Sequence, residues 1–189
     1  MDTTVELKRR QFSVKDYHRM IETGILTKDD RVELLEGEIV EMAPIGNPHQ
    51  ATVDRLTRLF ISRLGERVIV RIQGPVLLAS VESEPQPDVA LLMPRSDFYS
   101  TRRPEPEDIL LLVEVMDTSV EKDRRVKLPL YARAGIAETW LVDLNAERVE
   151  VHRRPGPAGY ADSRTLRRGE PLAIQAFPDV ALTVADLLG

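Results

Sequence analysis

The sequence predicts a single α/β domain in which helices alternate with the strands of a central sheet. The chain has 189 residues, a length that fits one domain of ~100–200 residues. Apolar residues recur three or four apart from His49 to about Leu64, which is the spacing of an amphipathic helix. Ile109–Val115 is instead a continuous apolar run, as expected of a strand covered on both faces.

Composition narrows the class of protein. Hydrophobic residues make up 42% of the chain and charged residues 30%, as in ordinary soluble globular proteins. No apolar run approaches the ~20 residues of a membrane-spanning helix, and the first ten residues carry charges where a secretion signal needs an apolar segment. The absence of cysteine excludes disulfides and thiolate metal sites. We therefore expect a cytoplasmic protein.

The net charge of −5 argues against indiscriminate nucleic-acid binding, which depends on a broad basic surface. Local basic groups nevertheless occur at Arg55/Arg58, Arg102/Arg103, Lys122/Arg124/Arg125/Lys127 and Arg153/Arg154. Acids gathered in a metal site would also make the net charge of the chain more negative than the local charge of a groove that faces substrate.

The N-terminal third predicts a helix, a hairpin and a second helix. Ser13 can cap a helix that runs to Thr23, before Gly24. Arg31–Met42 predicts a hairpin turning at Glu36-Gly37, because glycine suits the positive φ of a tight turn. A loop from Pro44 to Pro48 then leads into the His49–Leu64 helix. Residues 1–12 are expected to form a peripheral arm.

The middle of the chain predicts the interior of the sheet. Arg67–Ile72 and Pro75–Val81 predict a second hairpin around Gln73-Gly74. Asp88–Met93 predicts a short strand, entered through prolines that cannot donate ladder bonds. The loop Pro94–Asp108 separates it from the interior strand Ile109–Val115.

A helix is expected from the cap residues Asp117-Thr-Ser119 to Ala134, with Gly135 past its end. Pro129 is awkward there, because a proline inside a helix costs about 3 kcal/mol or more. Either the helix starts late, with Pro129 in its first turn, or it bends between Lys127 and Tyr131.

The C-terminal part predicts a strand pair, weaker strand and turn segments, and a last short helix capped by Thr183. The segments are Thr139–Leu144 and Arg148–Arg153 joined through Asn145-Ala146, a loop at Gly156–Gly159, strand and turn over Tyr160–Ile174, and the helix Val184–Leu188. No repeat or internal linker occurs, so residues 1–189 are expected to form one domain.

Two acids at strand ends are the main candidate site residues. Glu114 interrupts the apolar strand, and a buried carboxylate is costly unless a partner such as a metal ion or a structural ion pair compensates it. Asp88 begins another strand, although Pro-Asp is also common turn material. Together the two acids could present oxygens to one hard cation, and Mg²⁺ or Mn²⁺ suits such a pair. Such an ion would polarise a phosphodiester and activate water.

Other candidates are weaker by spacing alone. Lys127 could hold the attacking water or stabilise developing charge, but it also fits a solvated helix face. Glu33 lies in the predicted hairpin, where exposed acids are ordinary. His49 opens the long helix, and His18 and His152 show no ligand spacing with it.

A family resemblance adds to these observations. Pro87-Asp88 followed by Glu114-Val-Met116 resembles the Pro-Asp…(Asp/Glu)-x-Lys signature of the restriction-endonuclease-like superfamily. Nearly the whole chain, from about Tyr17 to Leu188, resembles the Uma-type (Uma-two) family of restriction endonucleases. The segments that carry this likeness are Val32–Ile39, His49, Gln86–Val89, Leu112–Val115, Lys127, Tyr131–Gly135 and Glu138–Asp143.

The resemblance implies a restriction-endonuclease-like fold, in which a central mixed sheet is flanked by helices. It implies that Asp88 and Glu114 converge as metal ligands, with Glu33 joining from the hairpin and Gln86 at the rim. Met116 stands where the superfamily pattern has lysine, so Lys127 on the following helix becomes its replacement.

The first functional hypothesis is a Mg²⁺-dependent DNA endonuclease that uses Asp88, Glu114, Lys127 and Glu33, with Gln86, His49 and Arg124 contacting substrate. The second is a catalytically inactive domain of the same fold that binds nucleic acid or protein, and a third is a structural subunit without nucleic-acid contact. A homodimer is expected for cutting both strands, and the apolar segment Val68–Val81 is one candidate surface for it.

Overall fold

The computed structural model describes residues 9–189, so most of the predicted arm at 1–12 lies outside the described residues. At the centre is a six-stranded sheet in the order β3-β4-β5-β6-β7-β8. Only β5 and β6 are parallel neighbours among these strands. The predicted mixed sheet is therefore confirmed. Its strands are β3 Ile69–Ile72, β4 Val89–Leu92, β5 Ile109–Met116, β6 Glu138–Asp143, β7 Arg148–Gly156 and β8 Gly159–Arg167.

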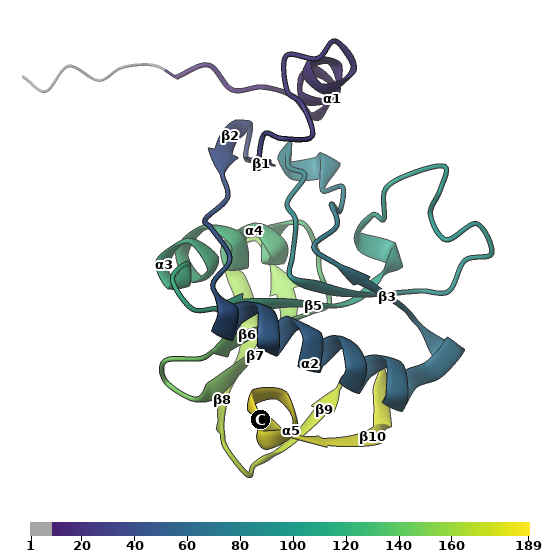
Figure 1. Ribbon diagram of the computed structural model, residues 1–189, viewed down its shortest axis with the longest axis vertical. Coiled ribbons are helices and arrows are strands. Elements are labelled where there is room, and N and C mark those ends of the chain that lie inside the picture. The colour runs from purple at the N-terminus through teal and green to yellow at the C-terminus, as the bar shows by residue number, and fades with distance from the viewer. Residues whose placement is uncertain (1–8) are drawn as a thin grey trace, which may run out of the picture.

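Apolar side chains cover both faces of this sheet. On one face, Phe60 of helix α2 packs with Trp140 of β6, their ring centroids 6.2 Å apart. On the other face, Leu112 of β5 packs in a cluster with Leu130 and Tyr131. Figure 1 shows α2, Asn47–Leu64, crossing in front of the sheet and α4, Leu128–Arg133, behind it. The continuous apolar run of β5 is explained by these two layers, which confirms the prediction of an interior strand.

The N-terminal segment forms a lobe beside one end of the sheet (Figure 1). Helix α1, Val14–Glu22, begins at a capping box made by Ser13 and Asp16. Strands β1, Val32–Leu35, and β2, Glu38–Glu41, pair antiparallel. Their turn residues Glu36 and Gly37 have φ of 48° and 79°, the left-handed backbone that a two-residue hairpin needs.

Helix α2 runs from Asn47 to Leu64 and starts two residues before the predicted His49. Pro48 lies in its first turn, where a missing N–H costs nothing because that donor has no partner within the helix. His49 therefore lies in the first turn of the helix, where its ring reaches Asp88 at the start of β4.

The predicted hairpin of Arg67–Ile72 with Pro75–Val81 is wrong. Strand β3 pairs with β4 instead, and the later segment contains the short 3₁₀ turn η2, Ala79–Val81. Its backbone donors go elsewhere, Val76 N to Pro85 O at 3.0 Å and Leu77 N to Pro104 O at 2.8 Å. Val76 and Leu78 are fully buried, so this segment offers no apolar hairpin surface to a second copy of the chain.

The helix expected after β5 is continuous from residue 120 to residue 133, with a wide turn inside it. A single turn α3, Val120–Lys122, is followed by a π-helical turn, Asp123–Lys127, and then by α4, Leu128–Arg133. Pro129 lies in the first turn of α4, but Lys127 before it already has helical φ and ψ of −67° and −45°, so the late-start alternative is wrong. The wide turn lies directly ahead of the proline, and there Leu128 N donates to Asp123 O. Gly135 follows with φ of 84°, as a helix-ending glycine should.

The C-terminal elements complete the layer that contains α2. Strands β9, Pro171–Ile174, and β10, Phe177–Thr183, form a separate antiparallel pair, and β10 was not predicted. Helix α5, Val184–Leu188, begins at a capping box made by Thr183, as predicted. None of the helices in the described part of the chain has the length and apolar character needed to cross a lipid bilayer.

Candidate active site

The register of the sheet brings Asp88 and Glu114 together. Strands β4 and β5 are antiparallel, and Val89 lies opposite Val113. One step further out, Asp88 therefore lies opposite Glu114. Directly opposed residues of antiparallel strands project from the same face, so two acids 26 positions apart share one side of the sheet.

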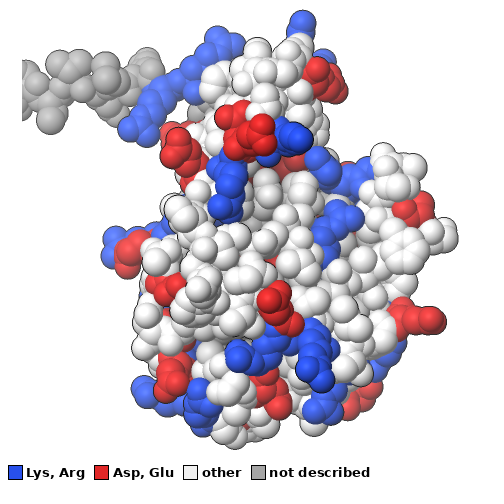
Figure 2. All heavy atoms as spheres, viewed as in Figure 1, with Lys and Arg blue, Asp and Glu red and all other residues white. Residues whose placement is uncertain are grey.

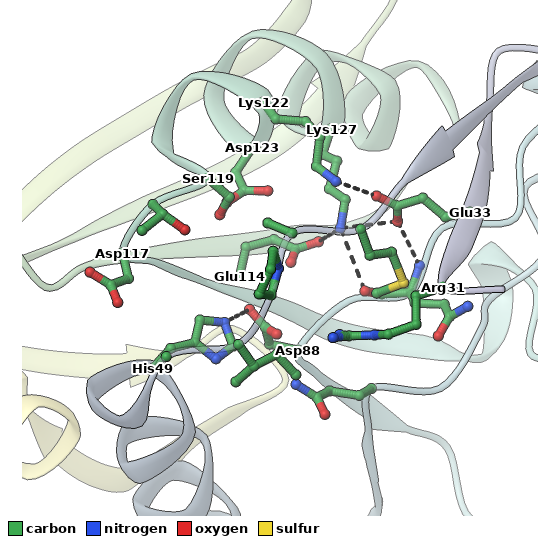
Figure 3. A pocket seen from close by; sticks show the side chains of 18 residues that line it. Arg31, Glu33, His49, Asp88, Glu114, Asp117, Ser119, Lys122, Asp123 and Lys127 are labelled. Atoms are coloured by element: carbon green, nitrogen blue, oxygen red, sulfur yellow. Dashed lines mark hydrogen bonds and ion pairs between the residues drawn. The ribbon is translucent and has the colours of Figure 1, made fainter. Parts of the chain in front are cut away.

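These two acids line a pocket bounded by the hairpin, the start of α2 and the segment after β5. Figure 3 shows the carboxylates and the lysines pointing toward one another from these elements. The pocket is lined by Glu33, Asp88, Glu114, Asp117 and Asp123, and by the basic residues Arg31, Lys122, Lys127 and His49.

Asp88 is fixed through one carboxylate oxygen. Its Oδ2 accepts a hydrogen bond from the Val115 backbone N at 2.8 Å and lies 3.0 Å from His49 Nε2. The hydrogen bond with Asp88 raises the pKa of His49, against the opposing effect of burial. Within residues 9–189, Oδ1 of Asp88 has no hydrogen-bond partner. One oxygen therefore remains open to the pocket.

Glu114, like Asp88, is hydrogen-bonded to described residues through one carboxylate oxygen only. The residue is 2% exposed, and its Oε1 accepts the Tyr131 hydroxyl at 2.5 Å and the Lys127 ammonium at 3.2 Å. Burial raises the pKa of Glu114 to about 8, with Asp123 and Asp88 adding to the effect and Lys127 opposing it. No described residue donates to Oε2, so this oxygen is also uncommitted.

Lys127 and Glu33 form the floor of the pocket. Lys127 Nζ lies 3.2 Å from Glu33 Oε2 and 3.2 Å from Glu114 Oε1. Burial alone would lower the pKa of this ammonium, but the two carboxylates outweigh it and raise the pKa. Glu33 also accepts from Lys122 at 2.8 Å and from the Gln86 backbone N at 3.1 Å. Despite its burial, the pKa of Glu33 is lowered by the two lysines.

The donor set fits a hard divalent cation. The open oxygens of Asp88 and Glu114 face the same pocket, and Mg²⁺ characteristically takes one or two carboxylates plus waters and substrate phosphate oxygens. Across residues 9–189 no group of three or more histidine, aspartate and glutamate side chains is close enough to enclose an ion. The pocket therefore resembles a shared protein–substrate site more than an all-protein cage.

The remaining predicted residues divide between the pocket and its surroundings. Gln86 lines the pocket, and its amide donates to Val32 O at 3.3 Å. His49 is hydrogen-bonded to Asp88. Arg124 instead points outside the pocket, with its guanidinium 2.6 Å from Glu150 Oε1.

Residues in and beside the pocket to which the sequence assigns no role include Lys122 and Asp123, which line it, and Tyr131, which is hydrogen-bonded to Glu114. Burial raises the pKa of Asp123, whose carboxylate is hydrogen-bonded by Ser119. Asp123, Lys127 and Tyr131 follow one another at intervals of four, a spacing that puts side chains on one face of a helix. This interval of four is the feature of the sequence that relates Asp123 and Tyr131 to Lys127.

A six-stranded mixed sheet flanked by helices, with paired acids at the end of two central strands, defines a restriction-endonuclease-like fold. A solved structure of similar fold is a protein from Anabaena variabilis described as a putative nuclease belonging to DUF820. The two share 14% identity and superpose with a TM-score of 0.76, over 94% of this chain and 97% of the other. This similarity establishes the fold.

The family follows from the sequence itself. The model of the Uma2 family, described as "Putative restriction endonuclease", matches residues 14–185. The chain therefore belongs to the Uma2 family, as its motifs predicted. No curated protein matches it in sequence.

Proposed function

We propose that this protein is a divalent-metal-dependent endonuclease that hydrolyses phosphodiester bonds in DNA. One observation carries the proposal. Asp88 and Glu114 oppose each other across β4 and β5, each with one oxygen bound and one open to a shared pocket. Membership of a restriction endonuclease family makes DNA the expected substrate.

Asp88 and Glu114 would hold the ion. Bound there, Mg²⁺ or Mn²⁺ would supply Lewis-acid polarisation of a phosphoryl oxygen and a bound water of lowered pKa. His49 and the Val115 N–H keep the Asp88 carboxylate in place. Tyr131 and Lys127 do the same for Glu114.

Lys127 is proposed to stabilise the charge that develops on the phosphoryl oxygens. The residue is 4% exposed, and its ammonium lies 3.2 Å from both Glu33 and Glu114. A preorganised cation in a water-poor site needs no reorientation during the reaction. Glu33 is bound through both oxygens by Lys122, Lys127 and Gln86, so we assign it to positioning the lysines.

Cleavage of supercoiled plasmid in Mg²⁺ or Mn²⁺ tests the proposal. Asp88→Asn and Glu114→Gln should each lower the rate by about 10³-fold, equivalent to about 4 kcal/mol of lost transition-state stabilisation. Glu41→Gln is the matched control, because it makes the same chemical change at an exposed carboxylate of β2. Full activity in both site variants would refute the assignment.

A non-cleaving nucleic-acid-binding domain is the second candidate, favoured by Met116 at the usual lysine position. Met116 is fully buried and supplies no charge. Calorimetric titration with Mn²⁺ separates the candidates, since only the nuclease predicts binding that Glu114→Gln abolishes. Dimerisation stays a prediction, to be checked by the molar mass in solution.

A further inference from the structure

A second cluster of charge lies beyond the pocket, around the loop that follows β4. We call it the arginine–aromatic patch. Three guanidinium groups surround the ring of Tyr99, at 5.5 Å for Arg71, 5.1 Å for Arg95 and 5.5 Å for Arg102. The patch consists of Arg71, Arg95, Phe98, Tyr99, Arg102 and Arg103.

The loop is held in one conformation by its own polar groups. Asp97 accepts from Arg95 at 2.8 Å and from Thr101 at 2.8 Å, and the Tyr99 hydroxyl donates to Met93 O at 2.8 Å. Phe98 and Tyr99 both have left-handed backbone, with φ of 49° and 58°, which is unfavourable for bulky residues. The result is an aromatic ring, Phe98, that is 70% exposed on a fixed support.

Arg71 is the arginine of the patch without a carboxylate partner. Arg95, Arg102 and Arg103 pair with acids at 2.8, 2.5 and 3.4 Å. Among the described residues, Arg71 has no carboxylate within salt-bridge distance. Besides its position over the Tyr99 ring, it donates one long hydrogen bond, to Phe98 O at 3.5 Å. Burial and the nearby charge of Arg103 lower its pKa. An anion placed between Arg71 and Arg103 would offset the repulsion between the two guanidinium groups.

The patch lies on the same sheet face as the candidate site. Gln73, which lines the pocket, donates its backbone N–H to Asp88 O at 3.1 Å. Arg71 is two residues away on β3, so its side chain projects to the same side, roughly 7 Å along the strand. Figure 2 shows Lys and Arg side chains, interspersed with acidic ones, between the N-terminal lobe and the body.

We propose that the arginine–aromatic patch binds the sugar-phosphate backbone of duplex DNA next to the cleaved bond. Arg71 and Arg103 contact phosphates, Phe98 packs against a sugar or an unstacked base, and Arg95 and Arg102 hold the loop. The bidentate fork of arginine matches phosphate geometry, and aromatic faces stack on bases of any identity. This inference rests on the proposed function, because it assigns that site its substrate contacts.

Binding of fluorescently labelled duplex DNA, followed by anisotropy in EDTA on the Glu114→Gln background, tests the patch without cleavage. Arg71→Ala and Arg103→Ala should each weaken binding about eightfold at 0.1 M salt. Each should also reduce the slope of log affinity against log salt by about 0.9. Arg71→Lys should keep the slope. Phe98→Ala should weaken binding equally at all salt concentrations, because an apolar contact releases no counterion.

Arg164→Ala is the matched control. It removes the same charge from an exposed position of β8, at the opposite edge of the sheet, and should leave binding unchanged. Wild-type affinity in both arginine variants, an equal loss in the control, or no DNA binding at all would overturn the inference. Arginine-dependent binding by a wild type that cuts nothing would instead refute the proposed cleavage and leave the patch standing.

Discussion

Two buried glutamates on neighbouring central strands have opposite surroundings. Glu138 of β6 is fully buried and closed. Its Oε1 accepts the Trp140 indole N–H at 2.9 Å and the Arg153 Nε at 2.8 Å, and its Oε2 accepts the Gln175 backbone N at 2.7 Å. Glu114 of β5 is bonded through one oxygen only, and the other faces a pocket.

The difference shows that burial of an acid does not by itself identify a site. Glu138 is saturated by groups of its own chain, so it ties β6, β7 and the segment after β9 together. Glu114 has spare capacity and a pKa raised by its burial. A buried carboxylate left incompletely satisfied beside a pocket is the informative observation.

Glu138→Ala should have the largest effect on stability. It leaves Arg153 and the donors of Trp140 and Gln175 without their acceptor, which should cost about 3–5 kcal/mol. Glu114→Gln should cost less, because the amide oxygen can still accept from Tyr131 and no described residue donates to the oxygen that the change replaces. Urea denaturation measures both. Equal losses would mean that the two glutamates play the same structural role.

Lys127→Met should lower the free energy of unfolding by about 3 kcal/mol, the low end for a broken buried pair, because Lys122 still pairs with Glu33. Adding Glu33→Gln should recover about 1–2 kcal/mol, since the two sites are coupled. Lys15→Met, on the exposed face of α1, is the control and should be neutral. Strictly additive losses would contradict a bridging role for Lys127.

Tyr131→Phe should weaken Mn²⁺ binding about tenfold with little change in melting temperature, because it removes a group that orients a proposed ligand rather than the ligand. Calorimetry or the loss of the free-ion electron paramagnetic resonance signal measures the affinity. Tyr17→Phe serves as the control, since its hydroxyl bonds Val32 O at 3.3 Å outside the proposed ligands. An unchanged affinity would show that Lys127 alone orients Glu114.

The smallest expected effect is on the pH dependence of the stability of the fold. Glu150 lies among His152, Arg124 and Arg148, and these neighbours lower its pKa from an ordinary 4.5 to about 2. A depressed pKa means that the ion pairs stabilise the fold above about pH 4.5 and lose this effect as the pH falls toward 2. Glu150→Gln should therefore show a shallower loss of stability over that interval than the wild type. Parallel acid-denaturation curves would argue against the paired state.

Most of the fold could be predicted because local rules and tertiary packing agree. Capping residues such as Ser13 and Thr183 mark helix starts, and the apolar run of β5 marks the interior. The hairpin predicted after Arg67 does not form, and the reason is physical. Gln73-Gly74 suits a tight turn, but β3 gains more by pairing with β4, a partner that periodicity within a short window cannot reveal.

The candidate site also contains residues that the sequence reveals and contacts that only the folded chain reveals. Asp88 and Glu114 stand out in sequence as acids bordering or interrupting apolar strands. Their mutual distance depends on a register that only the folded sheet defines. Tyr131 and Lys122 contribute contacts between elements distant in the chain. The pairing of Arg124 with β7 likewise depends on where the π-helical turn docks.

The π-helical turn at Asp123–Lys127 makes this region sensitive to chain length. An α-helix has 3.6 residues per turn, so one added or deleted residue rotates everything beyond it by about 100°. Such wide turns behave as single-residue insertions into a helix. Deleting one residue there would restore regular geometry and swing the Lys127 ammonium away from Glu114, so spacing here matters as much as side-chain identity.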